Sequence, residues 1–278
     1  MYVTVLTALP HGLEGRVVEV QCDVAAGSQP SFNVVGLAAA SIREARERIP
    51  SAFRNSALEF PRRRVTINLA PADLRKDGGG LDLPMAVAVW LAGQGRAAPP
   101  GCAFLGELGL DGSLRHVTGV LIAALALRAS GVTELYVDTA DAAEAALVAG
   151  LAVHPCRDLA SVLSAVTGAE PPPAYEAVAE AEPSDVPPAD DLADVQGQEE
   201  ARRALEVAAA GGHHLLLSGP PGAGKTMLAR CLPGILPPLE LHEAMEVAQV
   251  RSLLGELPRD GPLDWTRPFR APHHGISM

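Results

Sequence analysis

The stretch HLLLSGPPGAGKT, residues 214–226, decides how the second half of this chain folds. Residues 215–218 form a short apolar run typical of a buried strand, and residues 227–232 predict a helix. Between them GPPGAGKT (219–226) has the glycine and lysine spacing of a phosphate-binding loop, or P-loop. A strand, a glycine-rich loop and a helix in this order predict an α/β domain that binds a nucleoside triphosphate. The alternative is a glycine-rich loop that only resembles a P-loop.

The residues of this loop offer several kinds of contact to ATP. The glycines let backbone N–H groups wrap the phosphates, and the following helix directs its N-terminal end toward them. The Lys225 ammonium would reach the β- and γ-phosphates, and the Thr226 hydroxyl would bind the accompanying Mg²⁺. The candidate cofactor-binding residues are therefore Gly219, Pro220, Pro221, Gly222, Ala223, Gly224, Lys225 and Thr226, with Thr226 as the metal-binding residue.

The residues after Thr226 lack the remaining parts of an ATPase. Such enzymes hold Mg²⁺ with an acidic residue at the end of a second strand and orient the attacking water with another residue. The one apolar cluster there, 247–254, is interrupted by polar residues and followed by Gly255-Glu256, as at a helix end. No catalytic residue is identified, and we expect this chain alone to hydrolyse ATP poorly or not at all.

The net charge of −11 is concentrated in one segment. Residues 170–194 contain eight acidic and no basic residues and are rich in proline, as extended linkers are. The rest of the chain is almost neutral, so the overall charge does not identify a partner. We expect a first domain at 1–169, an acidic proline-rich linker at 170–194 and a second domain at 195–278.

The composition indicates a globular cytoplasmic protein. Hydrophobic residues make up 48% of the chain and aromatic residues 4%, so the cores are packed from alanine, valine and leucine. No apolar run reaches the roughly 18–20 residues of a membrane span, and the N-terminus lacks the basic start of a signal peptide. The four cysteines are scattered singly, without the spacing of metal ligands or disulfides. We expect no membrane partner.

The first domain alternates strand-like and helix-like segments, which predicts an α/β or α+β fold with at least one βαβ crossover. Pro50 is expected to end or kink the first helix. Expected strands are 2–6, 17–23, 32–35, 64–69, 134–137 and 153–155, with a hairpin of 103–110 and 114–116. Expected helices are 41–48, 83–91, 120–130, 140–149 and 159–167, followed in the second domain by 198–210 and 239–253.

Several segments resemble known ATPases. VQGQEEARRAL (195–205) resembles the helix that opens AAA+ ATPase domains and cups adenine, and 226–239 with RPFRAPHH (267–274) resembles the Mg-chelatase-type branch. In the first domain, NLAPADLRKDGGGLDLP (68–84) and FLGELGLDG (104–112) are similar to the Lon-protease-like domain of competence-type Mg-chelatase-like ATPases, the ComM/YifB family. The resemblance implies a Lon-protease-like α/β domain followed by a partial AAA+ domain.

This family resemblance also implies a function. It implies a homo-hexameric ring that uses ATP and Mg²⁺ to drive DNA branch migration as a helicase in natural transformation and recombination. The sequence after His274 departs from the family, so we expect a chain truncated after the P-loop region, without Walker B acid, sensor or arginine finger. Two alternatives stay open: a non-catalytic scaffold or DNA-binding module with a vestigial P-loop, and a magnesium chelatase-type partner ATPase, against which the first domain argues.

The Lon-like domain is not expected to be a protease. Aligning KDGGG (76–80) with the corresponding Lon segment puts Gly80 where Lon has its nucleophilic serine. The activating lysine of Lon falls at 120–122, where this chain has Val-Leu-Ile. A serine nucleophile needs a neighbouring base, and both groups are missing here.

An arginine-rich segment, 42–64, is the candidate nucleic-acid site of the first domain. It holds seven arginines against three glutamates, and cationic side chains gathered on one face suit phosphate contacts. The alternative is a solvated helix with Arg–Glu pairs one turn apart, such as Arg43–Glu47. The least compensated residues, and hence the candidates for DNA contact, are Arg62, Arg63 and Arg64.

Overall fold

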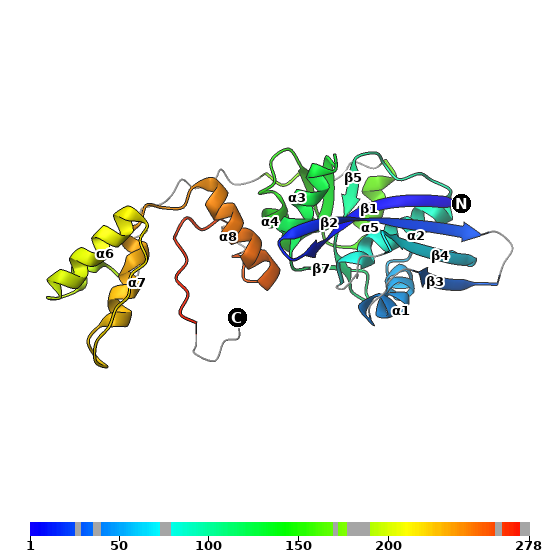
Figure 1. The fold of residues 1–278 in the computed structure, drawn as a ribbon. Coiled ribbons are helices and arrows are strands. Elements are labelled where there is room, and N and C mark those ends of the chain that lie inside the picture. Colours follow the sequence, from blue (N-terminus) through cyan, green and yellow to red (C-terminus); the bar gives the residue numbers. More distant parts are fainter. Residues whose placement is uncertain are drawn as a thin grey trace. The chain divides into compact units, whose positions relative to one another are not determined.

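The computed structural model describes residues 1–25, 29–35, 40–72, 79–168, 172–176, 190–258 and 263–272 (Figure 1). The chain divides into two compact units. The first comprises Met1–Val178 and Ala248–Pro262, and the second comprises Ala179–Val247 and Leu263–Met278. Each unit buries its own apolar core. No helix within the described ranges is long and apolar enough to cross a membrane.

A mixed seven-stranded sheet, in the order β3-β4-β2-β1-β5-β8-β9, organises the first unit. The β1–β2 and β2–β4 pairs are antiparallel, and the other four pairs are parallel. Parallel neighbours need crossover connections, which the helices supply. The predicted α/β class is confirmed. The strands are β1 (Tyr2–His11), β2 (Glu14–Ala25), β3 (Ser31–Val35), β4 (Arg64–Ala70), β5 (Cys102–Phe104), β8 (Glu134–Asp138) and β9 (Ala152–Cys156).

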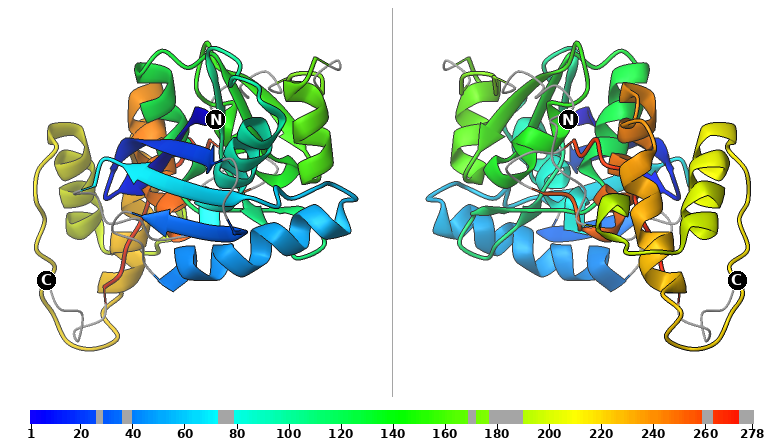
Figure 2. Two further views of the ribbon diagram at one scale, coloured as in Figure 1. Left: turned by 90° about the vertical axis from the view of Figure 1, so that its right-hand side faces the viewer. Right: turned by 90° about the vertical axis from the view of Figure 1, so that its left-hand side faces the viewer.

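The strands β1, β2 and β4 bury one face and expose the other. Along β2, the buried residues Val18, Val20, Cys22 and Val24 alternate with more exposed ones, the pattern of a half-covered sheet. The helices α2 and α3 pack on β1 and β2, and α1 packs beside β3 (Figure 2). The helices of this unit are α1 (Ala40–Asn55), α2 (Asp82–Gln94), α3 (Val120–Ala129), α4 (Ala142–Ala145) and α5 (Leu159–Val166), with short 3₁₀ turns η1 (Gly79–Leu81) and η2 (Thr139–Asp141).

The expected hairpin of 103–110 with 114–116 forms only in part. The short strands β6 (Glu107–Leu108) and β7 (Leu114–Arg115) pair antiparallel. The preceding strand, β5, instead joins the main sheet in parallel with β1 and β8. All three residues of β5 are buried, so sheet neighbours on both sides satisfy a backbone that water cannot reach.

The first helix is longer than the sequence predicts. We expected 41–48 with Pro50 ending or kinking it, but α1 continues through Pro50 to Asn55. A proline inside a helix removes one backbone hydrogen bond. Here Ile49, Ala52 and Phe53 are fully buried around it. An interior proline costs a helix about 3 kcal/mol, and the burial of Ile49 and Phe53, at about 1.5–3 kcal/mol each, offsets that cost.

The Asp82 carboxylate links three elements of the first unit. Its side chain, at the start of α2, is 2% exposed. Oδ2 accepts hydrogen bonds from Arg48 Nε of α1 at 2.8 Å and from the Leu108 backbone N–H of β6 at 3.3 Å. Oδ1 accepts from the Arg48 Nη2 at 3.1 Å. Burial raises the pKa of Asp82, and the guanidinium of Arg48 opposes that rise.

The second unit contains two helices packed around a small core. The helices α6 (Glu199–Gly211) and α7 (Lys225–Ile235) follow a 3₁₀ turn, η3 (Leu192–Asp194). A further helix, α8 (Leu241–Leu254), contributes its residues up to Val247 to this unit. The core consists of Leu192, Val195, Leu205, Leu228 and Cys231. Of the expected linker 170–194, the structure describes 172–176 and 190–194.

The strand expected at 215–218 is absent, and this prediction was wrong. Residues 213–220 carry no regular secondary structure, and Leu216 is 90% exposed. A strand is held by hydrogen bonds to neighbouring strands, and the described part of the second unit contains no other strand. Leu215 and Leu216 therefore have no sheet in which to bury their side chains, whereas Leu217 packs against the small core of the unit.

Replacing Asp82 by asparagine should strongly destabilise the first unit. The amide cannot compensate the charge of Arg48, and breaking a buried ion pair from one side costs about 3–5 kcal/mol. Urea denaturation should show this loss as a lower midpoint. Glu14→Gln, which breaks the exposed pair of Glu14 with Arg16, should leave the midpoint unchanged. Equal effects of the two substitutions would contradict the role given to Asp82.

Truncating Leu216 should barely change the stability of this chain. An exposed side chain outside a sheet contributes within about 0.5 kcal/mol. The matched substitution at fully buried Leu205 should cost about 2–5 kcal/mol. Urea denaturation of Leu216→Ala and Leu205→Ala compares them directly. A large loss for Leu216→Ala would mean that 215–218 pairs as a strand in solution.

Candidate nucleotide-binding site

The loop 219–224 has the backbone conformation of a glycine-dependent turn. Gly222 has φ +82° and Gly224 has φ +80°, values that side chains other than glycine rarely adopt. A Cβ at either position would meet no atom within 4 Å, so the need for glycine is conformational rather than steric. Gly224 precedes the first residue of α7, and the loop therefore leads directly into a helix N-terminus.

Lys225, the first residue of α7, points back into the loop. Its Nζ donates hydrogen bonds to the carbonyl oxygens of Gly219 and Pro220, both at 2.8 Å. The Ala223 N–H donates to the Pro220 oxygen at 3.3 Å and tightens the same turn. The ammonium thus lies against the backbone carbonyls of the loop.

Thr226 lies in the first turn of α7 with its side chain exposed. The first N–H groups of any helix lack intrahelical acceptors and carry partial positive charge. With the Lys225 ammonium beside them, these donors suit a polyphosphate, and the Thr226 hydroxyl suits a cation bound to it. The residues present therefore fit ATP and Mg²⁺. The side chains of the first three loop residues offer no contact to such a ligand, so these residues contribute backbone atoms only: Gly219, Pro220 and Pro221.

Gln198 is a contact that sequence reasoning missed. It precedes α6 in the left-handed conformation, φ +54°, and its Nε2 lies 3.5 Å from the Ala223 carbonyl. It lies in the segment 195–205 that resembles the opening helix of AAA+ domains, but the sequence did not indicate its contact with the loop. Along α6, a cavity of about 690 Å³ is lined by Val207, His213, His214 and Leu215 among others. It lies next to the segment that leads into the loop.

Among the described residues, Lys225 forms no salt bridge with a carboxylate. Within them, no cluster of three or more His, Cys, Asp or Glu residues could hold a metal ion. Arg267, from the segment 267–274, instead bonds Glu243 at 3.1 Å and donates to the Pro237 carbonyl at 2.8 Å. The hydrogen bond from the Glu240 N–H and the one from Arg267 lower the pKa of Glu243. This pair ties α8 to the segment after it.

The position that aligns with the nucleophilic serine of Lon has apolar surroundings. Gly80 is buried in η1, and a Cβ there would lie 3.0 Å from Leu105 Cδ1 and 3.9 Å from both methyl groups of Val117. Residues 120–122, at the expected lysine position, are buried in α3. Residues 76–78 lie outside the described part of the chain. Neither of the two compared positions carries a nucleophile or a base.

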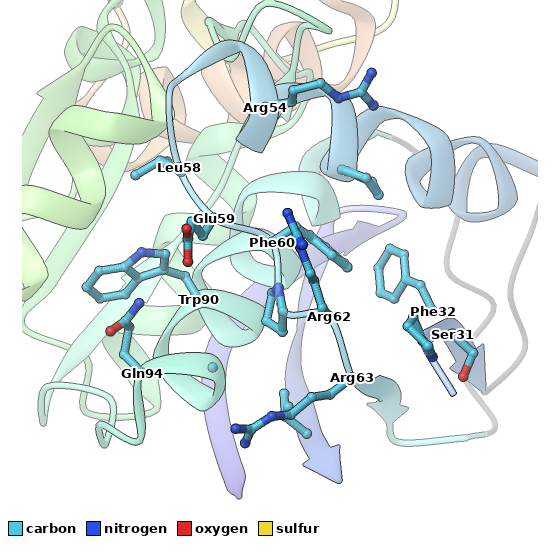
Figure 3. A pocket seen from close by; sticks show the side chains of 15 residues that line it. Ser31, Phe32, Arg54, Leu58, Glu59, Phe60, Arg62, Arg63, Trp90 and Gln94 are labelled. Carbon is cyan, nitrogen blue, oxygen red and sulfur yellow. The ribbon is translucent and has the colours of Figure 1, made fainter. Parts of the chain in front are cut away.

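The arginines proposed for DNA contact are exposed at the start of β4. Arg62 and Arg63 line a groove of about 830 Å³ in the first unit (Figure 3). Arg64, also exposed, begins the strand itself. On α1, the expected one-turn pairing occurs between Arg48 and Glu44 at 3.3 Å. The side chain of Arg43, expected to pair with Glu47, lies outside the described residues.

Comparison with known proteins assigns both units to one family. Residues 18–141 match a family described as subunit ChlI of Mg-chelatase, and residues 191–278 match magnesium chelatase, subunit ChlI. Competence protein ComM of Haemophilus influenzae is 40% identical over 273 residues, covering 96% of this chain and 53% of ComM. YifB of Salmonella typhimurium is 44% identical over 253 residues, covering 90% of this chain and 49% of YifB.

A protein of Mycobacterium tuberculosis is 42% identical over 270 residues, covering 96% of this chain and 53% of that protein. The chain thus spans about half the length of the curated relatives it matches. The predicted family is confirmed by matches in both units and by these identities. The chain belongs to the Mg-chelatase-like family that includes ComM and YifB.

Proposed function

We propose that this chain binds ATP with Mg²⁺ through residues 219–226. The observation that carries the proposal is the loop itself, with Gly222 and Gly224 at positive φ, a helix N-terminus behind them and Lys225 Nζ against the loop carbonyls. Backbone N–H groups at 222–226 would hold the phosphate chain. Lys225 would neutralise the β- and γ-phosphates, and Thr226 would complete the Mg²⁺ shell together with phosphate oxygens.

We further propose that the base lies toward α6. The 690 Å³ cavity there is within the range of ligand pockets and has apolar walls at Val207 and Leu215. It lies next to the segment that leads into the loop, so a nucleotide whose phosphates occupy 219–226 could place its base there. This arrangement matches the adenine-cupping helix that the family resemblance implies.

The biological role proposed is that of a DNA motor. A relative at 40% identity is named a competence protein, and competence concerns the uptake of DNA. We propose that the full assembly is a homo-hexamer that migrates DNA branches in the cytoplasm during transformation and recombination. The region described here would supply the first unit and the phosphate-binding part of each subunit.

A specific observation favours a second candidate. Leu216 is 90% exposed, so the strand that normally supports a P-loop is not formed here. A scaffold or DNA-binding module with a vestigial loop would tolerate that arrangement.

A chelatase-type partner ATPase, suggested by the names of the matched families, would require a large partner subunit for metal insertion into a macrocycle.

Titration of Mg·ATP into the 278-residue chain should give saturable heat, and Lys225→Ala should weaken binding about 10- to 100-fold. The ammonium–phosphate contact is a hydrogen bond to a charged group, worth about 1.5–3 kcal/mol. Isothermal titration calorimetry measures both affinities. Arg230→Ala serves as the control, because it removes an equal charge from an exposed position further along α7.

The outcomes separate an ATP-binding loop from a vestigial one. Heat that is lost in Lys225→Ala and kept in Arg230→Ala supports the proposed ATP site. No heat in the unmodified chain favours the scaffold with a vestigial loop. Equal heat in all three proteins would place nucleotide binding elsewhere and overturn the assignment of 219–226.

A further inference from the structure

A groove of about 830 Å³ in the first unit is not explained by ATP binding. It is walled by α1, α2, β3 and the segment 58–63, which connects α1 to β4. Its lining combines aromatic rings, prolines and arginines. Figure 3 shows Trp90 and Gln94 on one side, Phe32 and Ser31 on the other, and Arg62 between them.

The cationic groups of this groove have no ion-pair partners in the part of the chain that the structure describes. Arg54, Arg62 and Arg63 line it with exposed side chains, and none forms a salt bridge with any described residue. Glu59 is the one carboxylate among the lining residues. By contrast, Arg16, Arg48, Arg203 and Arg267 all pair with carboxylates within 4 Å. The groove therefore carries an excess of positive charge, which suits an anionic ligand.

The same groove offers flat apolar surfaces. Phe32, Phe60 and Trp90 are only partly buried, although each packs against the hydrophobic core. The Phe32 and Phe60 rings meet edge to face at 5.5 Å, and the Phe60 and Phe53 rings at 5.4 Å, so the aromatic wall is braced from behind. Trp90, which lies between buried residues near the C-terminal end of α2, lines the groove from the opposite side.

From these groups we infer that the groove binds single-stranded nucleic acid. A single strand presents repeated phosphates together with unstacked bases. Guanidinium groups contact the phosphates, and exposed aromatic rings stack on bases without regard to sequence. Trp90 provides a stacking surface, and Arg54, Arg62 and Arg63 provide the cationic track. A duplex keeps its bases stacked internally and can use only the arginines.

This inference deepens the DNA-directed part of the proposed function and rests on it. On this inference, the first unit is the part of the chain that binds a separated DNA strand. It does not depend on the P-loop, because all the lining residues belong to the first unit. Binding of an oligonucleotide should therefore occur without ATP and persist in Lys225→Ala. A failure of ATP binding and a failure of strand binding are thus measured separately.

The test is the fluorescence anisotropy of a labelled 20-nucleotide oligo(dT) titrated with the 278-residue chain. Arg62→Ala/Arg63→Ala should weaken binding and make the slope of log K against log salt less negative by about 1.4, as expected for two lost single-strand phosphate contacts. Trp90→Leu should weaken binding roughly 5- to 100-fold through lost stacking. Trp90→Phe, which keeps a ring and also controls for folding, should retain most of the affinity.

The control Arg16→Ala/Arg115→Ala removes the same charge from exposed positions of the first unit outside the groove. It should bind oligo(dT) as the unmodified chain does. The inference is overturned if no anisotropy change occurs up to ~100 µM protein, the weak end of non-specific binding. It is also overturned if the two double variants lose equal affinity, or if a 20-base-pair duplex binds as tightly as oligo(dT).

Discussion

The first unit depends on one buried carboxylate. Asp82 is nearly inaccessible to water, and an isolated charge there would be very costly. Arg48 from α1 and the Leu108 N–H from β6 compensate it only when α1, α2 and β6 take their observed places. The ion pair therefore specifies an arrangement as well as contributing to stability. Since α1 and α2 are two walls of the arginine-lined groove, the spacing of that groove follows from the same pair.

The described part of the second unit is held by helix packing rather than by a sheet. Leu205 of α6 and Leu228 and Cys231 of α7 form its core together with Leu192 and Val195, and this packing fixes the start of α7 behind the loop. The glycine conformations and the lysine contacts depend on that helix start rather than on a sheet. This explains how the loop can keep its shape although residues 215–218 do not form a strand.

Local pattern predicted most of the first unit. The two-residue alternation in β2 and β4 and the continuous apolar run of α2 correspond to what was expected. The errors arose where contacts with distant residues decide the secondary structure. Burial of Ile49 and Phe53 stabilises α1 beyond Pro50. Residues 215–218 are irregular because the described part of the second unit offers no neighbouring strand.

In the candidate sites, too, local sequence pattern did not predict contacts between distant residues. The P-loop spacing is local and was visible in the sequence, whereas the approach of Gln198 to Ala223 was not. Arg62 and Arg63 stood out by their charge alone. They share a groove with Trp90 because α2 packs against the chain between α1 and β4. No short segment of the sequence encodes that packing.

The position of Lys225 has a consequence for the entry of an anion. The ammonium donates to two carbonyl oxygens of the loop, so these hydrogen bonds hold the lysine and the loop together. An incoming anion must compete with those carbonyls for the lysine, and the carbonyls must then turn to water. An anion therefore contacts the lysine only after these internal hydrogen bonds are broken. Anions that offer the lysine only one weak contact gain little from entering the loop.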